Sequence, residues 1–246
     1  MDRLVYTAMT GARHILEQQA STANNLANAT TTGFRAQLDS FRAVPVVAEG
    51  LPTRTFVVDS TVGADLRAGP IQTTGRNLDV ALRGEGWIAV QSADGSEAYT
   101  RNGSLRVNQN GLLETTSGQT LQGDGGPIAI PPESNVTIGG DGTVSVISTD
   151  TKPGPSNVLG RIKLVNPDGK SLVRGDDGLF RLKSGVAAEN DPAVRLVDGA
   201  LEGSNVNPVD AMVNMISLAR SFETQMSLLK NAENNAAKAS QILALN

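Results

Sequence analysis

Few residues in this 246-residue chain could carry out chemistry. It has no cysteine and one histidine, His14, so thiol chemistry is excluded. A zinc or nucleophile site built on His14 would lack the companion residues that such sites need. A lone histidine between Arg13 and Ile15 is typical of a surface or interface position. We therefore predict no metal site and no catalytic residue here.

Short motifs that resemble known sites also lack their defining companions. "RGEGW" at 83–87 has no third glycine for a dinucleotide loop, and "SLLK" at 227–230 lacks the partner motifs of Ser-x-x-Lys enzymes. "GGDGT" and "NPDGK" lack the alternating acids of a calcium loop, so we interpret them as turns. We predict no cofactor, no small-molecule ligand and no enzyme activity. A pair of acids that meet only in space would reopen the enzyme alternative.

Composition excludes two classes of partner. The net charge is −4 and no basic stripe appears, which argues against nucleic-acid binding. No apolar stretch approaches the ~20 residues that span a bilayer, so we expect no membrane insertion. The N-terminus has no basic region followed by an apolar run. We expect a protein that stays in the cytoplasm or leaves it without a cleaved signal peptide.

The N-terminal segment, residues 1 to about 28, has the spacing of an amphipathic helix. Its seam positions alternate steps of three and four. Gly11 weakens the helix, and isolated helices of this length are marginal in water. The seam positions are Met1, Val5, Ala8, Ala12, Ile15, Gln19, Thr22 and Leu26.

The C-terminal segment predicts a longer helix. Asn207 suits the N-cap, Pro208 the first helical position and Asp210 the first turn. No Gly or Pro follows, so a continuous helix would have about 35 residues and a length of about 50 Å. Its seam positions are Met215, Leu218, Phe222, Gln225, Leu229, Ala232, Ala236, Ala239 and Leu243.

The middle of the chain predicts an antiparallel β body. Short alternating runs such as "WIAVQ" and "EAYTR" are separated by turn sequences such as "SADGS" and "QNG". The predicted fold class is α+β, with long N- and C-terminal helices pairing as a coiled-coil-like domain beside a central antiparallel β domain. We expect a discontinuous helical domain (1–35 plus 205–246), an extended connector (36–72) and a β-rich domain (73–204). Because neither seam is strong, we infer that neighbouring molecules stabilise the helices.

Four segments resemble bacterial flagellar rod and hook proteins. They are "ANNLANATTTGFR" (23–35), "TTGRNLDVALRGEGWIAVQ" (73–91), "YTRNGSLRVNQNGLLETTSGQTLQG" (99–123) and "LEGSNVNPVDAMVNMISLARSFE" (201–223). They occur in the order found in that family and cover both ends of the chain. The opening and ending residues resemble those of proximal rod members, with distal rod and hook members as the alternatives.

The resemblance implies a structural subunit of the flagellar basal body. Such subunits polymerise into a hollow helical rod that spans the periplasm, transmits torque and encloses the export channel. In this family the terminal helices form the inner wall of the tube. The implied partners are other copies of the chain, neighbouring rod proteins and the flagellar type III export apparatus. The other class that we consider is a secreted β-rich binding module with helical oligomerisation ends. One Trp and two Tyr make its aromatic sugar site hard to build.

We expect the assembly interface to lie in the two terminal segments. Buried amides can fix the register of packed helices, so we hypothesise that Asn24, Asn25 and Asn28 align neighbouring helices. In the alternative interpretation they only end the helix before residues 30–33 turn the chain. The N-terminal candidates are Ile15, Asn24, Asn25, Leu26, Asn28, Gly33 and Phe34. The C-terminal candidates are Asn205, Met212, Met215, Ile216, Leu218, Arg220, Phe222, Glu223, Met226 and Leu229.

Overall fold

The computed structural model describes residues 2–45, 55–148 and 156–243, and it divides into two compact units. The helical unit consists of Met1–Ala29, Gln37–Asp65 and Val206–Asn246. The β unit consists of Thr30–Ala36 and Leu66–Asn205. Helices and antiparallel strands are therefore segregated, which confirms the α+β class.

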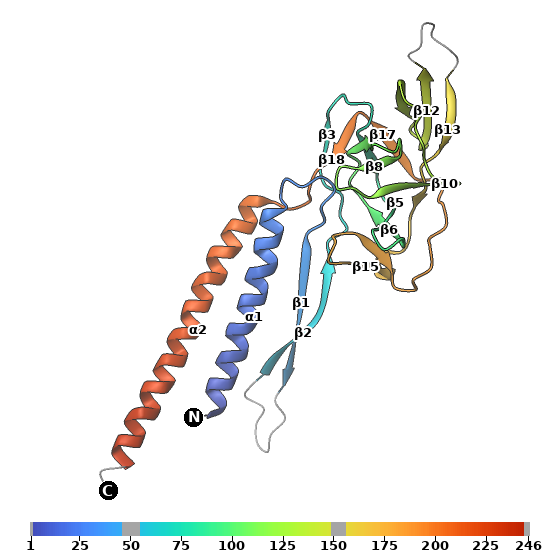
Figure 1. Ribbon diagram of the computed structural model, residues 1–246. Helices are drawn as coiled ribbons and strands as arrows, with labels where there is room; N and C mark the ends of the chain where they lie inside the picture. The colour runs from blue at the N-terminus through green and yellow to red at the C-terminus, as the bar shows by residue number, and fades with distance from the viewer. Residues whose placement is uncertain (1, 46–54, 149–155, 244–246) are drawn as a thin grey trace. The chain divides into compact units, whose positions relative to one another are not determined.

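Two helices dominate the helical unit. Helix α1 (Asp2–Ala27) has 26 residues and helix α2 (Pro208–Leu243) has 36, and the two lie side by side (Figure 1). Asn207 caps α2 as predicted, because its Oδ1 accepts the Val209 N–H at 3.0 Å. Helix α2 thus begins where the sequence predicted.

Helices α1 and α2 contact each other. Gly11 of α1 faces Gln225 of α2, and a Cβ built at Gly11 would lie 3.5 Å from the amide nitrogen of Gln225. Buried or half-buried residues recur every three or four positions on both helices. On α1 they include Ala8, Ala12, Ile15, Gln19, Thr22 and Leu26, and on α2 they include Ala211, Met215, Leu218, Phe222, Gln225, Leu229 and Ala232.

A β-hairpin completes the helical unit where the sequence suggested an extended connector over 36–72. Strand β1 (Gln37–Pro45) pairs antiparallel with β2 (Thr55–Ala64), and both strands contact α1. The segments are rich in Val, Thr and Phe, which favour paired strands. Each segment therefore finds its partner in the other, and the division by contacts places 37–65 with the helices.

The β unit is built from antiparallel pairs. A nine-stranded sheet has the order β15-β16-β6-β5-β9-β8-β7, with β10 on β9 and β14 on β5. A three-stranded sheet, β11-β12-β13, and the pairs β17-β4 and β18-β3 complete it. The bounds are β3 Ile71–Thr73, β4 Val80–Arg83, β5 Trp87–Gln91, β6 Glu97–Thr100, β7 Leu105–Val107, β8 Leu113–Thr115, β9 Thr120–Gly123, β10 Gly126–Pro127, β11 Ser134–Ile138, β12 Thr143–Ser148, β13 Asn157–Arg161, β14 Leu164–Val165, the 3₁₀ helix Gly169–Ser171, β15 Leu172–Arg174, β16 Phe180–Leu182, β17 Arg195–Asp198 and β18 Ala200–Glu202.

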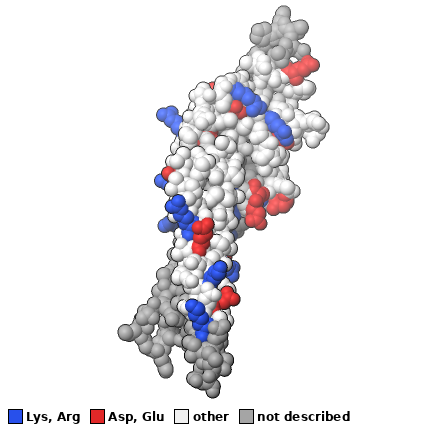
Figure 2. All heavy atoms as spheres, turned by 90° about the vertical axis from the view of Figure 1, so that its left-hand side faces the viewer, with Lys and Arg blue, Asp and Glu red and all other residues white. Residues whose placement is uncertain are grey.

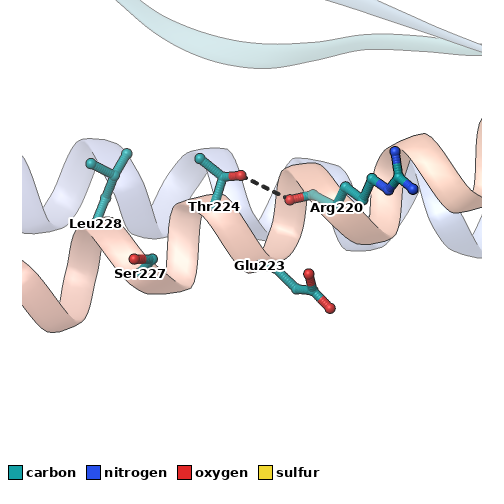
Figure 3. A pocket seen from close by; sticks show the side chains of 5 residues that line it. All are labelled: Arg220, Glu223, Thr224, Ser227 and Leu228. Carbon is teal, nitrogen blue, oxygen red and sulfur yellow. Dashed lines mark hydrogen bonds between the residues drawn. The ribbon is translucent and has the colours of Figure 1, made fainter.

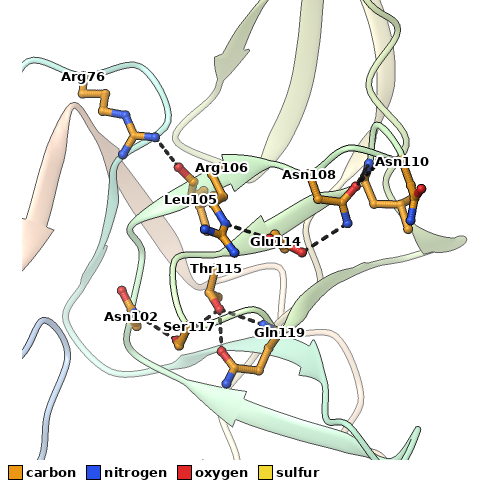
Figure 4. A network of polar contacts seen from close by, with 11 residues as sticks. Arg76, Asn102, Leu105, Arg106, Asn108, Asn110, Glu114, Thr115, Ser117 and Gln119 are labelled. Carbon is orange, nitrogen blue, oxygen red and sulfur yellow. Dashed lines mark hydrogen bonds and ion pairs between the residues drawn. The ribbon is translucent and has the colours of Figure 1, made fainter.

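Turn residues fix the hairpins that the sequence predicted. Asn108 Oδ1 accepts the N–H groups of Asn110 and Leu112, both at 2.9 Å, in the turn between β7 and β8 (Figure 4). Glu114 accepts hydrogen bonds from Asn108 at 3.1 Å and from Arg106 at 2.7 Å. These bonds hold the pKa of Glu114 below its ordinary value, Asn108 having the larger effect. The turn and its flanking strands are thus locked by local polar contacts.

One apolar core unites the strands of the β unit. It draws buried side chains from the large sheet, the three-stranded sheet and the β17-β4 pair. Its fully buried members include Val80, Ile88, Val90, Leu105, Leu113, Leu121, Val144, Ile162 and Leu164.

Gly103 marks a point where two backbone segments touch. Its carbonyl accepts the Val80 N–H at 3.0 Å, and a Cβ built at Gly103 would lie 1.7 Å from the Val80 carbonyl oxygen. We expect Gly103→Ala to lower the free energy of unfolding by about 3 kcal/mol, because the backbone must separate to admit the methyl group. Urea denaturation of the purified chain measures this loss.

Gly125→Ala is the matched control, since a Cβ at Gly125 meets nothing within 4 Å. We expect its free energy of unfolding to change by less than about 0.5 kcal/mol. Equal stabilities for the two variants would contradict the close approach at Gly103.

Candidate assembly surface on the helical unit

Helix α2 has a second apolar face that its packing against α1 leaves uncovered. Val209, Met212, Val213 and Ile216 follow the i, i+3, i+4, i+7 spacing of a single helix face. Between 52% and 65% of each of these side chains is exposed. We call these four residues the outer stripe. Contiguous exposed apolar surface of this kind marks an interaction site more often than a solvated face.

Two shallow depressions lie on the exposed side of α2. Val213, Ile216 and Arg220 help to line the first, which overlaps the outer stripe, and Arg220, Glu223 and Leu228 help to line the second. Thr224 Oγ1 donates to the Arg220 carbonyl at 2.9 Å (Figure 3). The side chains of Arg220 and Glu223 point away from each other, so two opposite charges are presented separately.

Helix α1 also exposes apolar side chains. Tyr6, Met9 and Leu16 are 56%, 57% and 49% exposed. Arg13 lies between them in the sequence and pairs with Glu17 at 2.9 Å. His14 Nδ1 lies 3.2 Å from the second carboxylate oxygen of Glu17, which places the histidine in a local contact on the helix. Both helices thus carry uncovered apolar side chains.

Charge does not organise this surface. Figure 2 shows acidic and basic side chains scattered among uncharged ones on the face in view. Among the described residues, no cluster of His, Asp and Glu is placed to hold a metal ion. No helix in the described part of the chain combines the length and apolar character needed to cross a bilayer.

The C-terminal candidates from the sequence divide between two faces of α2. The structure makes Met215, Leu218, Phe222 and Leu229 half-buried. It places Met212, Ile216, Arg220, Glu223 and Met226 on exposed positions. Sequence reasoning followed the seam and missed Val209 and Val213, although a search for a second stripe of the same period would have found them.

The three asparagines near the C-terminal end of α1 have different surroundings. Asn25 makes two hydrogen bonds with the first residue of β1: its Nδ2 donates to the Gln37 carbonyl at 2.9 Å, and its Oδ1 accepts the Gln37 N–H at 2.7 Å. Asn28, which follows the last residue of α1, donates through its side-chain amide to the carbonyl of Asn24 at 2.9 Å. The side chain of Asn24 is exposed. Asn25 therefore binds within the chain, whereas Asn24 is presented outward. Ile15 and Leu26, the other candidates on α1, are half-buried.

The paired bonds of Asn25 generate a direct test. We expect Asn25→Ala to lower the free energy of unfolding by about 2 kcal/mol, because the Gln37 N–H and carbonyl both lose their side-chain partner. Thermal unfolding of the purified chain measures the loss. Asn24→Ala is the control, and we expect it to change stability by less than about 0.5 kcal/mol because the side chain is exposed. A larger effect at position 24 than at position 25 would contradict this assignment.

The remaining candidates, Gly33, Phe34 and Asn205, belong to internal contacts of the β unit. Gly33 has a positive φ of 69°, and its N–H donates to the Glu202 carbonyl at 2.8 Å. Phe34 is buried, with the Arg174 guanidinium 4.4 Å from its ring centroid. Asn205 Oδ1 accepts the N–H of residue 36 at 2.7 Å.

A buried ionic cluster lies at the same place and was not foreseen from the sequence. Glu202 Oε1 accepts from Arg35 Nη2 at 2.6 Å, and Glu202 Oε2 accepts from Arg101 Nη1 at 2.9 Å. The three side chains are 0–4% exposed. Burial lowers the pKa of Arg101, and the charge of Glu202 opposes that shift. The partners are 101 and 167 positions apart, so no local pattern links them.

Comparisons with known proteins agree on one family. Residues 81–146 match the family model described as the flagellar hook protein FlgE/F/G D1 domain, and residues 197–242 match the flagellar basal body rod FlgEFG protein C-terminal model. The chain is 49% identical to the flagellar basal-body rod protein FlgF of Escherichia coli strain K12 and to that of Salmonella typhimurium strain LT2, over the full length of every chain. It is 32% identical to the basal-body rod protein FlgG of Buchnera aphidicola subsp. Schizaphis graminum, with 89% of this chain and 91% of that protein covered.

Proposed function

This chain belongs to the FlgF family of flagellar basal-body rod proteins and is a structural subunit of that rod; we propose that the outer faces of α1 and α2 are the surfaces through which it polymerises. The proposal rests on one observation. Helix α2 is apolar on two faces, and only one of them is covered by α1. Burying the outer stripe against a neighbouring subunit would stabilise the contact by about 25 cal/mol for each Å² of apolar surface removed from water.

The subunit is proposed to assemble by heterologous contacts in the proximal rod. A contact between two different surfaces of identical or similar subunits, repeated at a fixed rotation, produces an open helical filament. The apolar side chains of the outer stripe and those exposed on α1 provide two such different surfaces. Such a filament would form the hollow shaft that transmits torque and encloses the export channel.

Pairing of the terminal helices is proposed to extend into a coiled-coil-like arrangement in the rod. The covered positions of α2 recur at steps of three and four, as required for a seam between helices. Neighbouring helices on the outer faces would complete the burial that two helices alone cannot provide. In this arrangement the helical unit is the polymerisation domain, while the β unit supplies a separately folded body.

The proposed partners follow from the same assignment. They are other copies of this chain, adjacent rod proteins and the flagellar export apparatus, which would deliver the chain without a cleaved signal peptide. The role is structural and not enzymatic, so no cofactor and no small-molecule substrate is proposed. Neither nucleic acid nor membrane insertion is part of the proposal.

The outer stripe provides the test of this function. We expect the double variant Val213→Ser/Ile216→Ser to keep the stability of the isolated chain within about 0.5 kcal/mol per site, because both side chains are already exposed. In cells that express only this variant, we expect incomplete rods and loss of swimming, measured by imaging isolated basal bodies and by motility in soft agar.

Val173→Ser/Val186→Ser is the matched control, since these valines of the β unit are 48% and 68% exposed and lie outside the stripe. We expect normal rods from it. Complete rods from Val213→Ser/Ile216→Ser cells would contradict the proposed surface.

Asn24 provides a second test, of axial register. Its exposed amide is proposed to bind a neighbouring helix in the rod, as a polar residue does in a packed helix seam. We expect Asn24→Leu to leave the isolated chain folded but to yield rods with disordered subunit spacing, as seen by electron microscopy of basal bodies. Rods of normal order and normal resistance to torque would contradict this role.

A further inference from the structure

We infer that Glu202 is a positioning residue for assembly: its carboxylate fixes the path of the chain where the chain passes between its two units. The chain passes between the helical unit and the β unit after residues 29, 36, 65 and 205. The inference rests on the proposed function, because it assigns to Glu202 the task of setting the segments that carry α1 and α2.

Glu202 forms hydrogen bonds with three parts of the β unit: residues 33–35, Gly69 and Arg101. Its Oε1 accepts from Arg35 Nη2 at 2.6 Å and from the Gly69 N–H at 2.8 Å. Its Oε2 accepts from Arg101 at 2.9 Å, and its carbonyl accepts the Gly33 N–H at 2.8 Å. One residue thus contacts the segment after α1, the segment after β2 and the body of the β unit.

The neighbouring atoms leave little room for another chain path. A Cβ at Gly33 would lie 2.3 Å from the Arg101 carbonyl carbon, and a Cβ at Gly69 would lie 2.2 Å from the Gly203 carbonyl oxygen. The three segments therefore approach to backbone contact around the carboxylate. Asn205 adds polar bonds to the same segments through Ala36 and Arg67, at 2.7 Å and 3.0 Å.

The negative charge of the Glu202 carboxylate compensates two buried positive charges. Arg35 and Arg101 are both buried, and each forms an ion pair with Glu202. Arg35 Nε and Nη1 and Arg101 Nε have no hydrogen-bond partner in the described part of the chain, so Glu202 carries most of the compensation. A neutral residue at 202 would leave two buried cations facing each other, which is far more costly than losing an exposed pair.

The helices are connected to this cluster by a few residues. Residue 36 is followed by Gln37, which Asn25 of α1 holds by two hydrogen bonds. Asn205 lies three residues after Glu202, and Asn207, the N-cap of α2, lies five residues after it. The cluster therefore holds residues 33–36 and 202–205, the last residues of the β unit before two of its connections to the helical unit.

The test compares Glu202→Gln with Glu114→Gln. Both positions carry ion-paired glutamates of the β unit, but Glu114 binds only Arg106 and Asn108 within one hairpin. By hydrogen exchange of the full chain, we expect Glu202→Gln to speed exchange at least about tenfold in segments 30–36, 66–70 and 203–205, while strand β5 keeps its protection. We expect Glu114→Gln to speed exchange only in its own hairpin.

The assembly readout separates this inference from the proposed function. We expect basal bodies from Glu202→Gln cells to have incomplete rods and those from Glu114→Gln cells to be normal. Complete rods with Glu202→Gln, or unchanged exchange in the three segments, would overturn the inference; in either case the tests of the outer stripe would still decide the proposed function.

Arg35→Met keeps the experiment informative if Glu202→Gln does not fold. That variant leaves a neutral Arg101–Glu202 pair and the Gly69 contact in place. We expect at least about tenfold faster exchange in 30–36 alone. Unchanged exchange in 30–36 would overturn the inference.

Discussion

The surface of the helical unit is determined by one constraint. Helices α1 and α2 each carry more apolar side chains than their contact with each other can bury. Met215, Leu218 and Phe222 of α2 are half-buried, whereas the outer stripe is exposed. No rotation of α2 about its axis could cover both faces with a single helix, because the stripes lie on different sides of the cylinder. The exposed face therefore follows from the sequence of α2, and burying it requires a surface other than α1.

The β unit, in contrast, buries its apolar side chains within itself. Its apolar side chains converge on one core, its hairpins are closed by Asx contacts such as that of Asn108, and its charged residues find partners nearby. It needs no second copy to bury its core. The chain thus combines a β unit that buries its own apolar core with a helical unit that leaves the outer stripe exposed.

The sequence was informative wherever a structural signal is local. The N-cap at Asn207, the covered seam positions and the turn at Asn108 each depend on residues within a few positions of one another, and each was predictable. The β1–β2 hairpin was missed because no short turn motif joins its strands, which are separated by residues 46–54. The Glu202 cluster was missed because its members meet only in the folded chain. Val209 and Val213 of the outer stripe were missed because the seam face of α2 already explained the periodicity, although Met212 and Ile216 were among the candidates.

The helical unit is made from three stretches of chain, and this has a kinetic consequence. Helix α1 ends at Ala27 and its partner α2 begins at Pro208, so their contacts close loops of very high sequence separation. Such contacts form slowly, since the loop must be closed before any contact within it contributes stability. During synthesis, α1 emerges from the ribosome long before α2 exists to receive it. Helix α1 therefore stays without its helical neighbour until α2 has been translated, and the seam between the two helices forms only after the whole β unit has been synthesised.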